Sequence, residues 1–105
     1  MFDFGFDNFD DSSSNARLQE LVDAYETHGT NAYFDSNELE AVATYYYEQG
    51  AFENALAVID HLLDLHPYSA DGWLRRGILL NNLGRYQEAL RTYQKAREQI
   101  GRAHV

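Results

Sequence analysis

The stretch that decides the fold is residues 73–96, WLRRGILLNNLGRYQEALRTYQKA. A shift of 34 residues places Leu39 on Trp73 and Gly50 on Gly84. Apolar or small residues recur in register across the whole stretch, at Ala43 and Gly77, Tyr46 and Leu80, Phe52 and Tyr86, Ala55 and Ala89, Leu56 and Leu90, Ile59 and Tyr93, and Leu62 and Ala96. A period of about 34 residues is typical of helix–turn–helix units that bury their apolar faces against stacked neighbours. The sequence therefore predicts two stacked helical hairpins.

The second copy carries a specific signature, W-x3-G-x6-G-x-Y-x2-A-x3-Y-x2-A over residues 73–96, which resembles the tetratricopeptide repeat (TPR). Arg76 stands where that family usually has Leu, so its aliphatic stem can pack while its guanidinium reaches water. The earlier copy, residues 36–69, resembles the family best in its later half, which closes at Pro67. Residues 33–35, YFD, resemble the segment before the opening repeat of some long bacterial TPR-array proteins.

Helical periodicity predicts an all-α fold with five helices, near residues 15–28, 36–49, 52–65, 70–83 and 86–98. Asp35 and Glu38 form a candidate capping box for the second helix, and Ser69 is a candidate cap for the fourth. Gly50 and Gly84 suit left-handed stops between antiparallel helices. We expect antiparallel helix–turn–helix repeats stacked as a short TPR solenoid.

Small and large side chains indicate how these helices should pack. We expect helix axes to approach closely at the small residues Ala43, Gly77, Ala55 and Ala89. Trp73 should be largely buried between neighbouring helices. A leucine at position 77 should then overpack the crossing.

The chain divides into four segments by pattern and composition. These are a flexible acidic-aromatic arm (1–13), an N-terminal capping helix and loop (14–35), a first TPR motif (36–69) and a second TPR motif (70–103). The front helix lacks the small-residue signature, so we interpret it as a half-repeat packed against Leu39 and Tyr46.

The arm begins with MFDFGFDNFDD, in which four Phe alternate irregularly with four Asp. One interpretation is a disordered tail whose aromatic side chains fold back onto the domain. The other is a linear motif whose phenylalanines insert into apolar pockets of another protein while the aspartates select a basic rim. The anchors would be Phe2, Phe4, Phe6 and Phe9.

Catalytic, cofactor and metal sites are not expected. The chain has no Cys, and His61 and His66 lie five residues apart, which is not the i, i+4 pair of a helical zinc site. The sequence has no G-x-S-x-G elbow and no phosphate-binding glycine loop. No apolar run reaches the roughly 20 residues of a membrane span. We predict a non-enzymatic, cytoplasmic protein without membrane contact.

The net charge of −9 conceals an asymmetry. Residues 1–69 carry fourteen Asp and Glu against one Arg, giving −13, whereas residues 70–105 carry three against seven Arg and Lys, giving +4. One interpretation is an ordinary solvated surface; the other is that the basic repeat meets an acidic partner or the acidic half of a second copy. The overall charge disfavours nucleic acid, despite a local basic patch of Arg75, Arg85, Arg91 and Lys95.

The resemblance to TPR proteins implies a concave groove, lined by the first helix of each pair, that holds an extended or helical peptide. The matching positions are Asn37, Glu40, Thr44, Tyr47, Glu48, Asp71, Leu74, Ile78, Asn81 and Asn82. Some TPR modules clamp a terminal carboxylate with Lys and Asn, where this chain has Glu40 and Thr44, which speaks against chaperone-tail binding. Basic residues of a peptide would instead meet the acidic positions.

These patterns are compatible with three functions. The first is a protein-interaction module that binds a peptide or partner protein through the groove. The alternatives are the opening cap of a longer or self-assembling array without a ligand of its own, and an arm that serves as ligand for another protein. Tyr86, Leu90 and Tyr93 should form an apolar strip beside Leu79 and Leu83, with Arg97, Gln99 and Gly101 making that edge partly polar. We therefore expect either a native chain that continues beyond Val105 or a homo-oligomer that buries the strip.

Overall fold

A computed structural model of the chain describes the backbone of residues 4–103 and the side chains of residues 15–102. This part consists of α1 (Phe4–His28), the 3-10 helix η1 (Gly29–Asn31), α2 (Ser36–Glu48), α3 (Phe52–Leu65), α4 (Ala70–Asn82) and α5 (Tyr86–Ala103). It contains no strand, so the predicted all-α class is confirmed. None of these helices is long and apolar enough to cross a bilayer.

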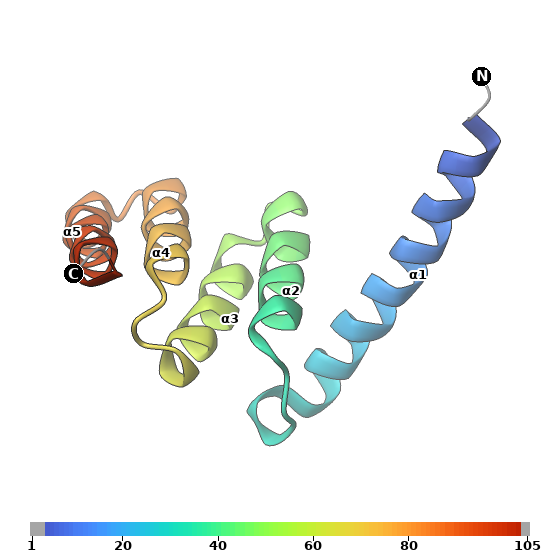
Figure 1. Cartoon of the computed structure of the whole chain (residues 1–105), viewed down its shortest axis with the longest axis horizontal. Coiled ribbons are helices and arrows are strands. Elements are labelled where there is room, and N and C mark those ends of the chain that lie inside the picture. Colours follow the sequence, from blue (N-terminus) through green and yellow to red (C-terminus); the bar gives the residue numbers. More distant parts are fainter. Residues whose placement is uncertain (1–3, 104–105) are drawn as a thin grey trace. The chain divides into compact units, whose positions relative to one another are not determined.

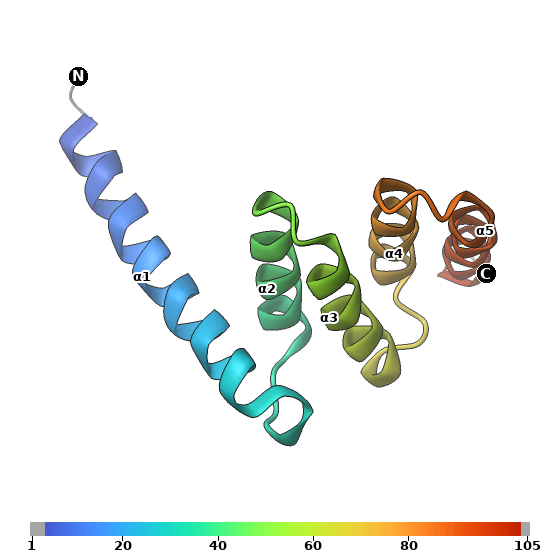
Figure 2. The same cartoon turned by 180° about the vertical axis from the view of Figure 1, so that it is seen from behind.

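The helices belong to two compact units, Met1–Tyr33 with α1 and η1, and Phe34–Val105 with α2 to α5. Within the second unit the four helices stand side by side in chain order and alternate in direction (Figure 1 and Figure 2). This arrangement is the predicted pair of stacked helical hairpins.

The first unit differs from the expectation at its start. Helix α1 begins at Phe4 rather than near residue 15, so the backbone of residues 4–13 is helical and not an extended arm. The expected start was wrong because the three serines at 12–14 lie inside the helix instead of capping it, and no proline in residues 4–28 interrupts it. Phe2 and the side chains of the other three arm phenylalanines lie outside the described residues.

The predicted caps of the second unit are confirmed. The Glu38 backbone N–H donates to the Asp35 carboxylate at 2.8 Å, and the Asp35 N–H donates to the Glu38 carboxylate at 2.9 Å, which completes the capping box of α2. The Gly72 N–H donates to Ser69 Oγ at 2.9 Å at the start of α4. Both helices therefore begin where their sequence signals place them.

In both hairpins the first helix ends at a glycine with a left-handed backbone conformation. Gly50 has φ +76° and Gly84 has φ +78°, a conformation that glycine adopts without steric cost. The N–H of Ala51 donates to the Tyr46 carbonyl, and the equivalent N–H of Arg85 donates to the Leu80 carbonyl, each at 2.9 Å. These are the 6→1 bonds of the Schellman motif, which satisfies carbonyl groups at the helix end.

The apolar side chains of α2, α3 and α4 form most of the core of the second unit. The buried apolar residues of this unit are Phe34, Leu39, Val42, Ala43, Tyr46, Ala55, Leu56, Val58, Ile59, Leu62, Leu63, Leu79, Leu80, Ala89 and Ala96. Three of the four small residues expected at close approaches are in this set, and the fourth, Gly77, is also buried.

Gly77 marks the closest crossing. A Cβ atom built on it would lie 2.5 Å from Cε1 of the Tyr93 ring, closer than real Cβ contacts allow. The ring of α5 therefore rests directly on the backbone of α4. The predicted tight approach at this position is confirmed, and any side chain larger than hydrogen must displace the tyrosine.

The second hairpin departs from the expectation in two other places. Trp73 is half-buried rather than largely buried, because its indole lies at the surface, where its N–H donates to the Pro67 carbonyl at 2.8 Å. Helix α5 continues to Ala103 instead of ending near Glu98. This extension packs onto the unit: Gln99 is buried instead of lying on the polar edge, and the Arg102 guanidinium carbon lies 4.8 Å from the centre of the Tyr68 ring.

Candidate functional site

The ten predicted groove residues lie on α2 and α4, and none of them is buried. Their helix neighbours Leu39, Val42, Gly77 and Leu80 are buried. Each helix therefore presents one face to the core and another to solvent, as a 3.6-residue period requires. This separates the candidate binding face from the core face.

A hollow of about 220 Å³ opens between α2 and α4. Its lining is mainly apolar and consists of Ala43, Thr44, Tyr47, Ile59, Arg75, Ile78 and Leu79. Ala43, Ile59 and Leu79 belong to the core and form its floor. Tyr47 and Ile78 remain exposed at its rim, 42% and 39% respectively. Large apolar side chains that stay exposed beside a hollow are typical of a surface that binds another molecule.

The polar end of the hollow is organised by Arg75. Its Nε donates to Oδ2 of Asp71 at 2.7 Å, one turn earlier on α4. Its Nη1 also reaches Oγ1 of Thr44 on α2 at 3.4 Å. A single guanidinium therefore connects the two helices that line the groove.

Glu40 lies near this arginine and takes part in the same polar cluster. Burial raises the pKa of the Glu40 carboxyl, while the Arg75 guanidinium opposes that rise. The charge of Asp71 and a hydrogen bond between the two carboxyl groups raise the pKa further. The Arg75 guanidinium thus pairs with Asp71 and also acts electrostatically on Glu40.

The structure brings only part of the predicted set together. Thr44, Tyr47 and Ile78 line the hollow, and Glu40 and Asp71 cluster with Arg75. The other predicted residues lie on α2 and α4 but do not line the hollow; they are Asn37, Glu48, Leu74, Asn81 and Asn82.

Residues 70–99, which form α4 and most of α5, match the sequence profile of the family described as Tetratricopeptide repeat. These residues are a tetratricopeptide repeat. The match includes three residues that line the hollow, Arg75, Ile78 and Leu79. The family is a non-catalytic scaffold for protein–protein interaction, and this is the class of function that the match indicates.

Two curated proteins are similar to parts of the chain. Protein DIA2 of Eremothecium gossypii is 39% identical over 51 residues, which is 49% of this chain and 7% of that protein. An uncharacterized protein of Methanocaldococcus jannaschii is 35% identical over 54 residues, which is 45% of this chain and 63% of that protein. The chain thus spans less than two thirds of the length of either relative.

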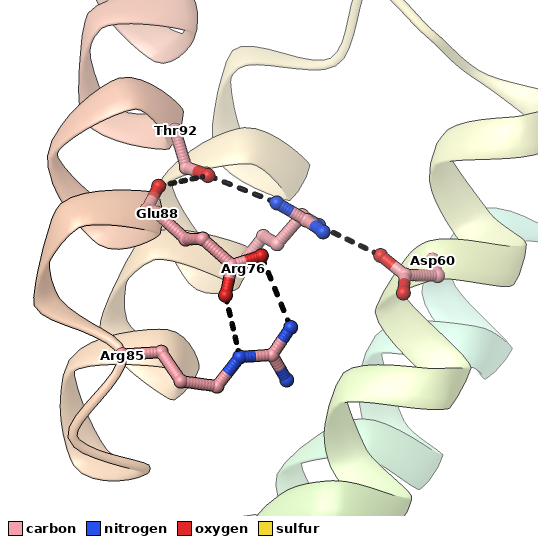
Figure 3. A network of polar contacts seen from close by, with 5 residues as sticks. All are labelled: Asp60, Arg76, Arg85, Glu88 and Thr92. Atoms are coloured by element: carbon pink, nitrogen blue, oxygen red, sulfur yellow. Dashed lines mark hydrogen bonds and ion pairs between the residues drawn. The ribbon is translucent and has the colours of Figure 1, made fainter.

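Another polar network lies on a different face of the tetratricopeptide repeat. Figure 3 shows Arg76 of α4 between Asp60 of α3 and Thr92 of α5, with hydrogen bonds of 2.8 and 2.9 Å. The Thr92 hydroxyl donates in turn to the Glu88 carbonyl, and the Glu88 carboxylate accepts two bonds from Arg85. These hydrogen bonds satisfy the guanidinium of Arg76, which stands where the family usually has leucine.

Arg75 is a groove residue that the sequence-based prediction assigned to a basic patch instead. The signal for the groove was present, because Asp71, Arg75, Ile78 and Asn82 follow the i, i+4, i+7, i+11 spacing of a single helix face. The patch itself is divided in the structure, since Arg75 pairs with Asp71 while Arg85 pairs with Glu88. The floor residue Ile59 comes from α3 and had no comparable signal.

Proposed function

We propose that the α2–α4 groove binds a peptide segment of a protein partner, in an extended or helical conformation. The hollow of about 220 Å³ between two equivalent helices, apolar at its floor and with Asp71 and Glu40 beside Arg75 at its polar end, is the observation that carries this proposal. The peptide places an apolar side chain in the hollow and a basic side chain at the carboxylate end.

The apolar anchor follows from what the hollow offers. Tyr47 and Ile78 expose large side chains on opposite walls, and the floor residues Ala43 and Leu79 are buried. Covering apolar surface of this kind contributes roughly 25 cal/mol per Å² removed from water. A leucine, methionine or phenylalanine side chain of the peptide fits this chemistry.

The basic side chain follows from the charges. Glu40, Glu48 and Asp71 stand on the groove side of α2 and α4 with Arg75 as the adjacent cation. A lysine or arginine of the peptide placed between Glu40 and Asp71 separates two carboxyl groups that otherwise repel when ionised. The same charges repel a terminal carboxylate.

The test is a selection of peptides from a random library on the whole chain, followed by affinity measurements on the groove variant Ile78→Glu. We expect that variant to lose binding at least about tenfold, because it replaces an apolar wall of the hollow with a carboxylate that must lose water when the peptide covers it. Leu90→Glu is the matched control, since Leu90 is exposed on α5 and should leave binding unchanged. An equal loss of peptide affinity in both variants would mean that the peptide binds outside the groove.

Charge reversal tests the acidic end. Glu40→Lys with Glu48→Lys should weaken a selected basic peptide mainly at low salt, because exposed charges are screened within about 8 to 10 Å at physiological ionic strength. Selected peptides that contain no basic residue, and whose affinity is the same for the charge-reversed variant, would contradict the electrostatic part of the proposal.

A second candidate function, the opening of a longer or self-assembling array, is favoured by the outer face of α5. Tyr86, Leu90 and Ile100 are exposed there, and no described helix covers them. The sequence-based prediction placed Leu79 beside this strip, but Leu79 is buried at the floor of the hollow, and Tyr93 is half-buried against Gly77. Sedimentation over a range of protein and salt concentrations should show association; a monomer throughout would argue against this function.

A further inference from the structure

The two hairpins differ in the polarity of the residues at four equivalent positions. The first hairpin has neutral, mostly apolar residues at four equivalent positions where the second has polar or cationic ones. The pairs are Val42 and Arg76, Ala57 and Arg91, Val58 and Thr92, and His61 and Lys95. The exchange places three basic side chains in one region of the second hairpin.

The structure gathers these residues around a cleft of about 260 Å³ between α4 and α5. Its lining is Trp73, Arg76, Glu88, Arg91, Thr92 and Lys95, none of which lines the hollow of the α2–α4 groove. At 100° per residue, Trp73 and Arg76 project from α4 on nearly the opposite side from Arg75 and Ile78. The cleft is therefore a separate surface.

The inner part of the cleft is fixed by internal bonds. Arg76 is held between Asp60 and Thr92, and the Trp73 indole N–H is taken up by the Pro67 carbonyl (Figure 3 shows the arginine). These bonds lock the arginine and the indole in one orientation. Part of the indole stays accessible as an apolar wall.

The outer part of the cleft carries two cations, Arg91 and Lys95. Arg91 is exposed and has no hydrogen-bond or ion-pair partner among the described residues, because the neighbouring Glu88 is already bidentate with Arg85. Lys95 Nζ lies over the Trp73 ring, 5.8 Å from its centre, and forms a long ion pair of 3.8 Å with Glu98 at the surface. Lys95 thus lies over the indole, and Arg91 lines the same cleft without a partner among the described residues.

We propose that this cleft binds an acidic peptide of a partner protein, with a carboxylate held by Arg91 and Lys95 and an adjacent apolar or aromatic side chain packed on Trp73. Paired cations beside an indole match that combination in charge and in shape. A nucleic acid fits less well, because Asp60, Asp64 and Glu88 border the same region and would repel a continuous chain of phosphates, whereas a peptide needs to place only one carboxylate between Arg91 and Lys95.

Trp73 is the only tryptophan of the chain, so its fluorescence reports on the cleft. The experiment titrates the whole chain with a blocked synthetic peptide of repeating Asp-Phe-Gly, and with the same peptide carrying Asn for Asp. The aspartate peptide should produce a saturable change that the asparagine peptide does not. Arg91→Gln with Lys95→Gln should weaken binding about tenfold, as expected for removal of charges that contact the ligand.

Two control variants separate this site from general electrostatics and from the groove. Arg17→Gln with Arg97→Gln removes the same charge at exposed positions outside the cleft and should leave affinity unchanged. Ile78→Glu, which disables the proposed groove, should also bind the aspartate peptide normally, so the two proposals fail independently. The cleft proposal is overturned by the absence of saturable binding, by equal losses in the two double variants, or by tighter cleft binding of oligo-dT than of the peptide.

Discussion

Helices α3 and α5 occupy equivalent places in their hairpins but face different surroundings. Leu56 of α3 is 6% exposed, whereas its equivalent Leu90 of α5 is 59% exposed. The difference arises because α4 packs against α3, while no described helix lies on the outer side of α5. An identical residue in an identical motif is therefore core in one copy and surface in the other.

In each hairpin, the size of the small residue on the first helix matches the size of the side chain opposite it on the second helix. Ala43 corresponds to Gly77, and Ile59 corresponds to Tyr93. The larger partner in the second hairpin is matched by the smaller residue opposite, since the Tyr93 ring fills the space that a Cβ on Gly77 would need. Complementary volume, and not residue identity, is what the two copies share.

The largest expected effect is the difference in unfolding free energy between alanine variants of Leu56 and Leu90. Leu56→Ala should lower the free energy of unfolding by about 2 to 5 kcal/mol, because it leaves a cavity in the core. Leu90→Ala should change it by less than about 0.5 kcal/mol. Urea unfolding of both variants measures the contrast, and a similar loss in the two would mean that α5 is covered in solution.

The next effect concerns the crossing of α4 and α5. Gly77→Leu should cost about 1 to 3 kcal/mol by displacing Tyr93, with a lower melting temperature. Gly101→Leu is the control, because a Cβ there meets nothing within 4 Å.

A double variant sharpens the same point. Gly77→Ala combined with Tyr93→Ile gives the second hairpin the pair found in the first, and its loss of stability should be smaller than the sum of the two single losses. Additive losses would show that the two side chains do not share the space.

A smaller effect is expected at the polar network. Arg76→Leu with Thr92→Val removes both ends of one hydrogen bond and restores apolar residues like Val42 and Val58 of the first hairpin. The free energy of unfolding should stay within about 1.5 kcal/mol of the wild type or rise, because replacing polar partners together leaves neither unsatisfied. Both variants leave Asp60 without its cation, but Arg76→Leu alone should be less favourable than the pair, since it also leaves the Thr92 hydroxyl oxygen without its donor.

The smallest effect is a pH dependence at Glu40, whose equivalent in the second hairpin is Leu74. The pKa of Glu40 is raised above its ordinary value of 4.5, so the folded state binds the proton more tightly than the unfolded state does. The contribution of Glu40 to the free energy of unfolding therefore decreases as pH rises from about 4.5 through the higher pKa of the folded state. Glu40→Gln should remove that slope.

Urea unfolding of the wild type and of Glu40→Gln over a pH series measures this difference. The advantage of the variant should grow with pH across the window and then level off. A difference that shrinks as pH rises would reverse the assigned direction of the shift.

Much of the fold could be predicted because its signals are local. The capping box of Asp35 and Glu38 and the stops at Gly50 and Gly84 depend on backbone conformation within a few residues, and the structure contains all of them. The helix ends without such a signal were misplaced, at the start of α1 and the end of α5. The helical period also separated the groove face of α2 and α4 from their core face.

The sequence by itself determined the repeat, its helices, its turns and its small residues, because each is encoded by spacing along the chain. Tertiary structure alone decided which side chains meet across helices. Arg75 reaches Thr44 across the groove while Arg91 stays without a partner among the described residues, and Trp73 lies partly exposed beside Lys95. These contacts depend on distances between residues far apart in the chain, which helical periodicity does not specify, and they are what distinguishes two hairpins built on one motif.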